Sequence, residues 1–478
     1  MVTATPVVYR LEDWQKGYRS LRQELAYWLE PAQGALPARL QGTLFRNGPG
    51  QLDLGGVAYG HPFDGDGMVV AMTFVGGRLH CANRFVRTPE YLAEQQAGTI
   101  LYRGVFGTQK PGGWWRNCLD LKFKNPANTN VIYHGGKLLA LWEASAPYRL
   151  DPTTLETLGR ETFQGALTPD QPFTAHPRRD PQTGDLWAFG VRTGLNSTLC
   201  FYRVDPQGSL VEKQEHSIPG FCFLHDFVWT PNYRIFFQNP VQFRSLPFVL
   251  GFKAAGMCLT SIPNTPTKIL VFDRQGSLIK LDSSPGFIFH FVNGFEVGDE
   301  IVVDALYYQD YPGLEAGVDY RKIDFATVPA ATLRRYILNL GSGSVREETL
   351  ISRSLEFPSI HPAYQGRAYR YVYLGATHSP VGNAPLQAIL KRDLELGTEV
   401  LRSFAPRCFV SEPIFVPDPQ GDKEDEGWVI VTLFDAGREA SAVVILDARD
   451  LEMVCRFDLP HHLPYGLHGM FTPEIFLT

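Results

Sequence analysis

Short apolar segments separated by turn residues run through most of the chain. Residues 131–133, 138–142 and 148–150 form three such segments, with Gly135-Gly136 between the first two and Asp151-Pro152 after the last. Alternating apolar and polar positions with Gly and Pro at the connections are typical of consecutive antiparallel strands. Helical periodicity is confined to Asp13–Glu30. The pattern predicts an all-β protein with an N-terminal helical extension over residues 1–40.

The same strand pattern repeats along the rest of the chain. Units begin near Thr43, Thr129, Thr174, Phe223, Phe289, Phe357 and Glu412. Repeats of about 45 to 65 residues suit the four-stranded blades of a propeller. We expect a single domain in which residues 41–478 form a seven-bladed β-propeller, with the segment after Tyr465 pairing with N-terminal strands to close the ring. Two successive β-sandwiches are the alternative architecture.

Composition and charge exclude several classes of protein. The 478 residues are 44% hydrophobic and carry a net charge of −6, without the basic surplus of a nucleic-acid binder. No uncharged apolar run approaches the roughly 18 residues that a membrane span needs. Residues 1–10 lack the features of a signal peptide, and the seven cysteines are scattered without a C-x-x-C pair. These features predict a cytoplasmic protein with reduced thiols.

Four histidines each occur once per repeat, in an apolar setting: His176, His225, His290 and His468. Their separations of 49, 65 and 178 residues match no local metal-binding motif. A single histidine among aromatic residues is more often a hydrogen-bonded core residue than a ligand. Four at equivalent repeat positions favour a shared metal site on the propeller axis, where imidazole suits iron, copper or zinc better than calcium or magnesium.

Three glutamates also lie among apolar neighbours: Glu143, Glu356 and Glu412. Glutamate is rarely buried unless its carboxylate has a partner. A metal-bound imidazole offers such a partner, because its second ring N–H remains free to donate. The alternative is that each carboxylate accepts a backbone hydrogen bond at the end of a strand.

These motifs together resemble the carotenoid cleavage oxygenase family, and within it the cyanobacterial apocarotenoid oxygenases. The resemblance rests on the histidine and glutamate contexts and on three further segments, Gly42–Gly50 (GTLFRNGPG), His61–Met68 (HPFDGDGM) and Gly382–Pro385 (GNAP). It covers essentially the whole chain. His61 and His361 recur in the family's flanking patterns without being ligands, and we expect them to be structural.

The resemblance implies a propeller with one Fe(II) on its axis and with loops and short helices covering the face that carries the site. Its ligands would be the four histidines, with the three glutamates accepting hydrogen bonds from three of them. Thr129 matches a threonine that crowds one of the two remaining iron positions, which leaves one position for O2. The implied reaction is cleavage of a conjugated double bond of an apocarotenoid, at the central 15,15′ position, to give retinal-type aldehydes.

Alternative functions remain open. The protein could cleave intact bicyclic carotenoids or stilbenoids, or isomerise a retinoid ester. It could also be a non-catalytic carotenoid-binding protein or a propeller scaffold for protein partners.

Two further groups of residues are assigned by position and by resemblance. A polyene needs a dry tunnel, and Phe63, Trp142, Phe289 and Tyr308 are the expected lining residues, with blade core as the alternative. Apolar residues bounded by Arg and Lys suggest peripheral contact with a membrane surface. The expected membrane-facing residues are Phe106, Phe248, Val249, Leu250 and Phe252, for which core packing is the alternative.

Overall fold

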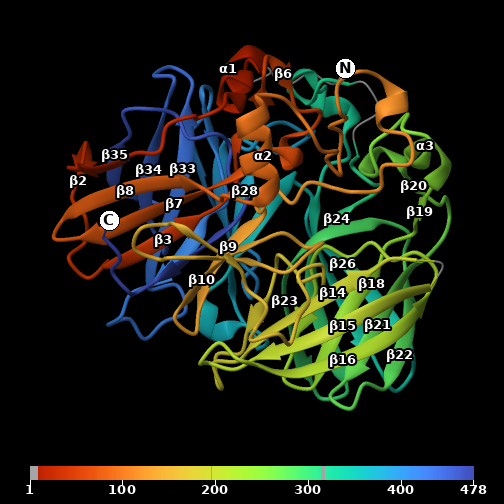
Figure 1. Cartoon of the computed structure of the whole chain (residues 1–478). Helices are drawn as coiled ribbons and strands as arrows, with labels where there is room; N and C mark the ends of the chain where they lie inside the picture. Colours follow the sequence, from red (N-terminus) through yellow and green to blue (C-terminus); the bar gives the residue numbers. More distant parts are fainter. Residues whose placement is uncertain (1–8, 195, 314–317, 478) are drawn as a thin grey trace, which may run out of the picture.

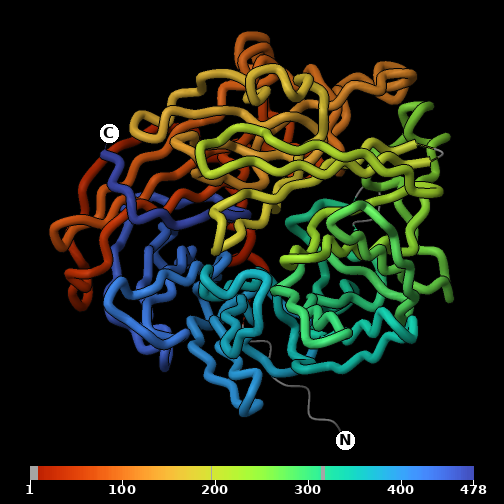
Figure 2. Tube along the Cα trace, turned by 90° about the horizontal axis from the view of Figure 1, so that it is seen from below, coloured from red at the N-terminus to blue at the C-terminus, as the bar shows by residue number. Residues whose placement is uncertain are grey.

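Seven β-sheets follow one another around a ring in the computed structural model, which describes residues 9–194, 196–313 and 318–477. Figure 2 shows the chain running once around this ring, so that the last, blue sheet returns to the first, red one. Each sheet corresponds to one of the seven repeats found in the sequence. The predicted seven-bladed propeller is confirmed.

The first and last blades share the ring closure. The first blade contains β1 (Ala26–Leu29), β8 (Arg78–Phe85), β7 (Asp66–Val75), β3 (Gly42–Arg46) and β36 (Gly469–Thr472), with β4 (Pro49–Gln51) paired to β7. The last blade contains β2 (Gln33–Gly34), β35 (Met453–Asp458), β34 (Ala440–Asp447), β33 (Gly427–Asp435), β31 (Cys408–Val410) and β32 (Ile414–Pro417). Strand β36 pairs antiparallel with β3, and β2 pairs with β35. The ring is therefore closed by an exchange of strands between the two ends of the chain.

The five blades between them each have four strands. The second blade has β9 (Asn130–His134), β10 (Lys137–Leu141), β11 (Tyr148–Leu150) and β12 (Thr157–Arg160). The third has β13 (Arg178–Arg179), β14 (Leu186–Arg192), β15 (Asn196–Val204) and β16 (Leu210–Pro219). The fourth has β17 (Val228–Trp229), β18 (Tyr233–Gln238), β21 (Thr267–Asp273) and β22 (Leu278–Ser283). The fifth has β23 (Phe287–Val297), β24 (Glu300–Tyr308), β25 (Thr332–Asn339) and β26 (Ser344–Ile351). The sixth has β27 (Leu355–Ser359), β28 (Tyr371–Ala376), β29 (Ala388–Asp393) and β30 (Glu399–Ser403).

Short helices and two small hairpins join the blades. The α-helices are α1 (Leu11–Gln15), α2 (Pro89–Ala97) and α3 (Ser245–Val249), and they lie towards the upper side of the molecule in Figure 1. The 3₁₀ helices are η1 (Lys16–Tyr18), η2 (Pro62–Asp64), η3 (Trp114–Arg116), η4 (Gly256–Cys258), η5 (Tyr320–Lys322), η6 (Phe325–Thr327) and η7 (Pro362–Tyr364). The hairpins pair β5 (Asp53–Leu54) with β6 (Val57–Ala58), and β19 (Val241–Phe243) with β20 (Leu259–Ser261). None of the helices in the described part of the chain is both long and apolar enough to span a membrane.

The N-terminal extension is less helical than its sequence pattern predicts. Its helices cover only residues 11–18, and residues 26–29 form the edge strand β1, which pairs with β8. Among its apolar side chains, Leu21 packs against Met68 and Phe85 of the first blade, and Trp14 packs in a cluster that contains Phe409 of the last blade. Residues 1–8 of the predicted extension lie outside the described residues.

Apolar clusters fill the spaces between neighbouring blades. One cluster joins the first and last blades through Leu44, Met72, Ile430 and Val443, all at most 1% exposed. Because each blade is covered on both faces by its neighbours, the central strands are apolar on both faces. Five of the seven free cysteines are buried, and the other two are partly buried.

Candidate metal centre

The four predicted histidines meet at one point. Their potential ligand nitrogens all lie within 4.8 Å of one another, and His176 Nε2 is 2.9 Å from His225 Nε2. These residues come from four different blades, and consecutive ones are 49, 65 and 178 residues apart in sequence. The ring closure brings the last of them, His468, next to the others, because it directly precedes β36.

Only one of the four histidines lies within a strand. His290 belongs to β23, where the pairing with β24 shifts register between Ile288 and Phe291. The other three lie outside the strands: His468 directly precedes β36, and His176 and His225 lie two and three residues before β13 and β17. The backbone leaves the strand ladder at these points. At His176, for example, the N–H donates to Thr174 Oγ1 and the next residue is a proline, which has no N–H to donate.

Each predicted glutamate accepts a hydrogen bond from a different histidine. The Nδ1 to carboxylate distances are 3.1 Å for His225 and Glu143, 2.7 Å for His290 and Glu356, and 2.8 Å for His468 and Glu412. A carboxylate partner at Nδ1 fixes the proton there and leaves Nε2 as the lone-pair nitrogen. Three of the four rings therefore present Nε2 as a ligand atom, while His176 has no carboxylate partner among the described residues.

The three carboxylates have different second partners. Glu356 also accepts from the Tyr308 hydroxyl, at 2.5 Å. Glu412 also accepts from the Arg46 guanidinium at 3.3 Å and from the Gly469 N–H at 3.0 Å. The second oxygen of Glu143 is buried without a hydrogen-bond partner in the described residues. The Arg46 and Tyr308 contacts are not visible in the sequence, because these partners come from other blades.

Burial controls the protonation of the centre. The pKa values of His176 and His468 lie well below the usual range of histidine. The main cause is burial, and repulsion from the neighbouring imidazoles is the second. Burial also raises the pKa of Glu412 to about 7, although Arg46 opposes this shift. Neutral imidazole is the form that binds a metal, so the first effect favours metal binding near neutral pH.

The donor set fits a transition metal. Four imidazoles converge without a carboxylate ligand, and His290 Nε2 is buried without a partner among the described residues. Such a nitrogen is costly to bury unless something binds it. An imidazole-only site suits iron, copper or zinc. We therefore identify this cluster as a site that can hold one metal ion.

An apolar cavity of about 410 Å³ opens onto the histidine cluster. The predicted tunnel residues Phe63, Trp142, Phe289 and Tyr308 and the predicted Thr129 all line it. The sequence did not single out further lining residues from the N-terminal extension and the loops, among them Tyr18, His61, Tyr320, Phe325 and Tyr465. Nothing in the local pattern around these residues distinguishes a cavity wall from a core.

The predicted membrane-facing residues separate into two groups. Phe252 is 58% exposed, and Val249 and Leu250 are partly buried. Phe248 is only 6% exposed, and the prediction for it is wrong. Its ring packs under the Arg103 guanidinium, 4.2 Å away, and against Phe123 and Phe243. Phe106 is partly buried and lines the cavity.

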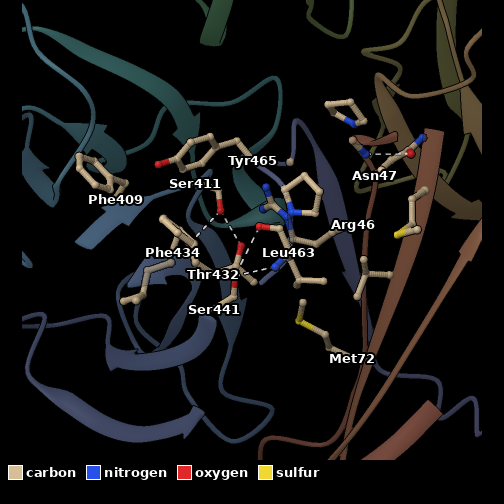
Figure 3. A pocket seen from close by; sticks show the side chains of 18 residues that line it. Arg46, Asn47, Met72, Phe409, Ser411, Thr432, Phe434, Ser441, Leu463 and Tyr465 are labelled. Carbon is tan, nitrogen blue, oxygen red and sulfur yellow. Dashed lines mark hydrogen bonds between the residues drawn. The ribbon is translucent and has the colours of Figure 1, made fainter. Parts of the chain in front are cut away.

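A second, smaller cavity of about 40 Å³ lies between the first and last blades (Figure 3). Hydrogen bonds link Ser411 to Thr432 and Ser441 to Leu463 in its wall. It contains none of the four histidines and is large enough only for a few water molecules.

Comparison with known proteins agrees with this geometry. A family model described as retinal pigment epithelial membrane protein matches residues 18–473. The apocarotenoid-15,15′-oxygenase of Synechocystis is 46% identical over 98% of this chain and 99% of its own length. The chloroplastic 9-cis-epoxycarotenoid dioxygenase of Oryza sativa is 32% identical over 92% of this chain and 72% of its own length.

Solved structures show the same fold. The crystal structure of cobalt-substituted Synechocystis ACO superposes with a TM-score of 0.95 at 45% identity, covering 97% of this chain and 99% of the other. The histidine cluster, the propeller and these similarities lead to one assignment. The chain belongs to the carotenoid cleavage oxygenase family, the family of the retinal pigment epithelial membrane protein.

Proposed function

We propose that this protein is an Fe(II)-dependent oxygenase that uses O2 to cleave a conjugated double bond of an apocarotenoid, at the central 15,15′ position, giving retinal-type aldehydes. The observation that carries the proposal is a centre of four histidines, three of them paired with carboxylates, that opens onto an apolar cavity. The 15,15′ position is supported by the name of the Synechocystis relative.

The residues of the chain have separate roles in this proposal. His176, His225, His290 and His468 would hold iron, and Glu143, Glu356 and Glu412 would orient three of the imidazoles and offset part of the metal's charge. Bound Fe(II) would supply the site at which O2 is activated. In the balanced reaction the C=C and O–O bonds break, and each carbon of the former double bond receives one oxygen atom as a carbonyl.

Thr129 would restrict access to the metal. It lines the cavity, and its carbonyl accepts the His468 N–H. Its hydroxyl donates to Asn128 Oδ1 at 3.3 Å, and its methyl group would limit one of the open positions of a bound metal. The aromatic walls would keep water away from the polyene and hold its double bond near the centre.

The test is product analysis with iron-loaded protein. We expect mass spectrometry to show retinal-type aldehydes from apocarotenals, with bleaching of the polyene absorbance and one iron per chain. His225→Ala should lose both iron and activity, whereas His361→Ala, outside the cavity, should keep both. Cleavage only of bicyclic carotenoids or stilbenoids, or bound pigment that persists with Fe(II) and air, would contradict the proposal.

We further propose that an apolar rim patch rests on a membrane surface. The rim patch consists of exposed residues from the segments around η3 and α3: Trp114, Trp115, Leu119, Leu121, Leu246 and Phe252. The two segments lie side by side, with the Trp114 and Phe252 rings 5.3 Å apart and Leu119 N–H donating to Val249 O (Figure 1).

Segments that follow or contact the rim patch line the cavity. Gly256 and Phe106 both line the cavity, and the Gly256 N–H donates to the carbonyl of Val105, next to Phe106. A polyene dissolved in a bilayer could then enter without crossing water.

In liposome co-sedimentation we expect Leu246→Ser with Phe252→Ser to weaken binding. The control pair Leu158→Ser and Leu396→Ser, which are as exposed but elsewhere, should not. Equal binding by both pairs would refute membrane contact through the rim patch.

A further inference from the structure

The polar groups in the cavity wall fall into two classes. Some already have protein partners: the Tyr308 hydroxyl donates to Glu356, the Tyr465 hydroxyl to Trp14 O, and the Ser354 hydroxyl to Asn383. Others have donors for which the described residues provide no partner, and two of these, on His61 and Tyr320, belong to rings that contact each other. An unpaired donor in an otherwise apolar wall is costly unless a ligand binds it.

The proton position on His61 follows from its backbone contact. The residue caps η2, and its Nδ1 accepts the Phe63 N–H at 3.2 Å. An accepting Nδ1 in a neutral imidazole places the proton on Nε2. Burial lowers the pKa of His61 to about 3, so the ring stays neutral at physiological pH. His61 therefore presents one N–H donor and no positive charge.

Aromatic rings hold this imidazole in place. Its ring centroid lies 4.6 Å from that of Phe63, 5.3 Å from that of Phe106 and 6.4 Å from that of Tyr320. Tyr320 is 4% exposed, and its hydroxyl is buried without a hydrogen-bond partner in the described part of the chain. The His61 N–H is therefore a donor that this wall can offer to the cavity, and the Tyr320 ring, whose hydroxyl is itself enclosed, packs beside it.

This wall is separate from the metal centre. The four histidines make ring contacts with one another and with Phe289 and Phe357, but within the described residues none with His61 or Tyr320. A molecule that contacts both places must extend across the cavity between them. Its apolar body would fill the cavity, and one end would offer a hydrogen-bond acceptor.

We propose that His61, with Tyr320 beside it, forms a subsite that binds the neutral oxygen terminus, an alcohol or aldehyde, of an elongated polyene. The inference rests on the proposed function for the polyene body and adds the selection of its end group. A carboxylate terminus fits poorly, because a neutral imidazole and a phenol supply no charge to balance it. A hydrocarbon terminus leaves the His61 donor unpaired.

The chain contains a matched control for His61. His361 is also followed by proline, also caps a 3₁₀ helix, and also accepts a backbone N–H at Nδ1, from Ala363 at 3.1 Å. Both histidines are partly buried and packed on aromatic rings. His361 does not line the cavity. The same substitutions at the two positions therefore separate the loss of a cap from the loss of the cavity donor.

The experiment measures kcat/KM for polyenes of equal length that end in an aldehyde, an alcohol or a hydrocarbon. We expect the wild-type protein to prefer the two oxygen-ended polyenes. His61→Asn keeps an acceptor for the cap but lacks the distal N–H, and His61→Phe keeps the ring but lacks both. Each should reduce the preference about five- to tenfold, as expected for one neutral hydrogen bond. His361→Asn and His361→Phe should leave it unchanged.

Three outcomes would overturn the subsite: an unchanged preference in both His61 variants, a loss in His61→Phe alone, or an equal loss in the His361 variants.

If the wild-type protein cleaves none of the polyenes, the proposed function fails and the subsite is tested by binding. Quenching of tryptophan fluorescence by the same three polyenes then gives Kd ratios. Trp14 and Trp142 both line the cavity and report on its occupation. The same five- to tenfold change in the Kd ratio is expected, and its absence would refute the subsite.

Discussion

The metal centre and the wall around His61 are built in different ways. The four histidines lie in blade strands or at most three residues before them, and the three glutamates come from the three other blades. The wall around His61 comes from loops and short helices, including η1, η2, the segment around Phe106 and η5. The comparison teaches that the propeller frame supports the reactive centre, while the loops shape what the cavity accepts. Changes at the two places should therefore affect different measured quantities.

The largest expected effect concerns Arg46, which supports the metal centre. Its buried guanidinium donates to the Glu412 carboxylate, to Glu412 O and to Leu467 O, next to His468. Removing one partner of a buried charged pair typically costs about 3–5 kcal/mol. Arg46→Met should lower the free energy of unfolding by that order in urea titrations and reduce iron content. Unchanged stability would show that the frame does not depend on this contact. Arg402→Met, which breaks an exposed ion pair with Glu452, serves as the control.

The second largest effect is expected when a histidine of the metal centre loses its carboxylate partner. Glu356→Gln keeps the shape of the side chain but removes the charge that faces His290 Nδ1. Losing such a partner typically lowers metal affinity by about 10- to 100-fold. Competition with a chelator should show this loss, and Glu348→Gln, on β26 and exposed, should not. Full affinity in Glu356→Gln would contradict the role of the carboxylate.

A smaller effect, on KM rather than on metal binding, is expected from a change in the cavity wall around His61. The Asp64 carboxylate accepts the N–H groups of Phe106, Gly107 and Thr108 and so fixes the loop that carries Phe106. Asp64→Asn should loosen this loop and raise KM about tenfold with little change in iron content, because hydrogen bonds to a charged group contribute about 1.5–3 kcal/mol. A parallel loss of iron would mean that the wall and the centre are not independent. Asp310→Asn, at an exposed position, serves as the control.

The smallest effect is a dependence of stability on pH. The pKa of His61 is lowered to about 3 by burial, whereas in the unfolded chain it returns to about 6.5. Between these values the unfolded state binds the extra proton, so the free energy of unfolding falls as the pH is lowered. One such group contributes at most about 1.4 kcal/mol per pH unit. In metal-free protein, urea titrations from pH 7 to pH 5 should give a shallower decline for His61→Phe than for wild type. An identical slope would show that His61 is already protonated or solvated in the folded state.

The sequence predicted much of the centre but little of the wall. His176, His225, His290 and His468 stood out because each occurs once per repeat, and a radially repeated fold brings equivalent positions together. Phe248 could not be judged in this way. Its apolar segment suits an exposed patch as well as a core, and the buried position depends on Arg103, far away in sequence. The helix predicted over Asp13–Glu30 failed for a related reason, since residues 26–29 gain backbone hydrogen bonds by pairing with β8.

By itself the sequence determined the seven repeats, the four histidines and the three glutamates, because these depend on period and residue type. Only the tertiary structure decided which atoms meet. It placed Arg46 on Glu412, Tyr308 on Glu356, and His61 in the cavity wall while the similar His361 lies outside it. The physical reason is that local pattern records whether a side chain prefers burial, whereas its partner and the space it faces are fixed when distant segments pack together.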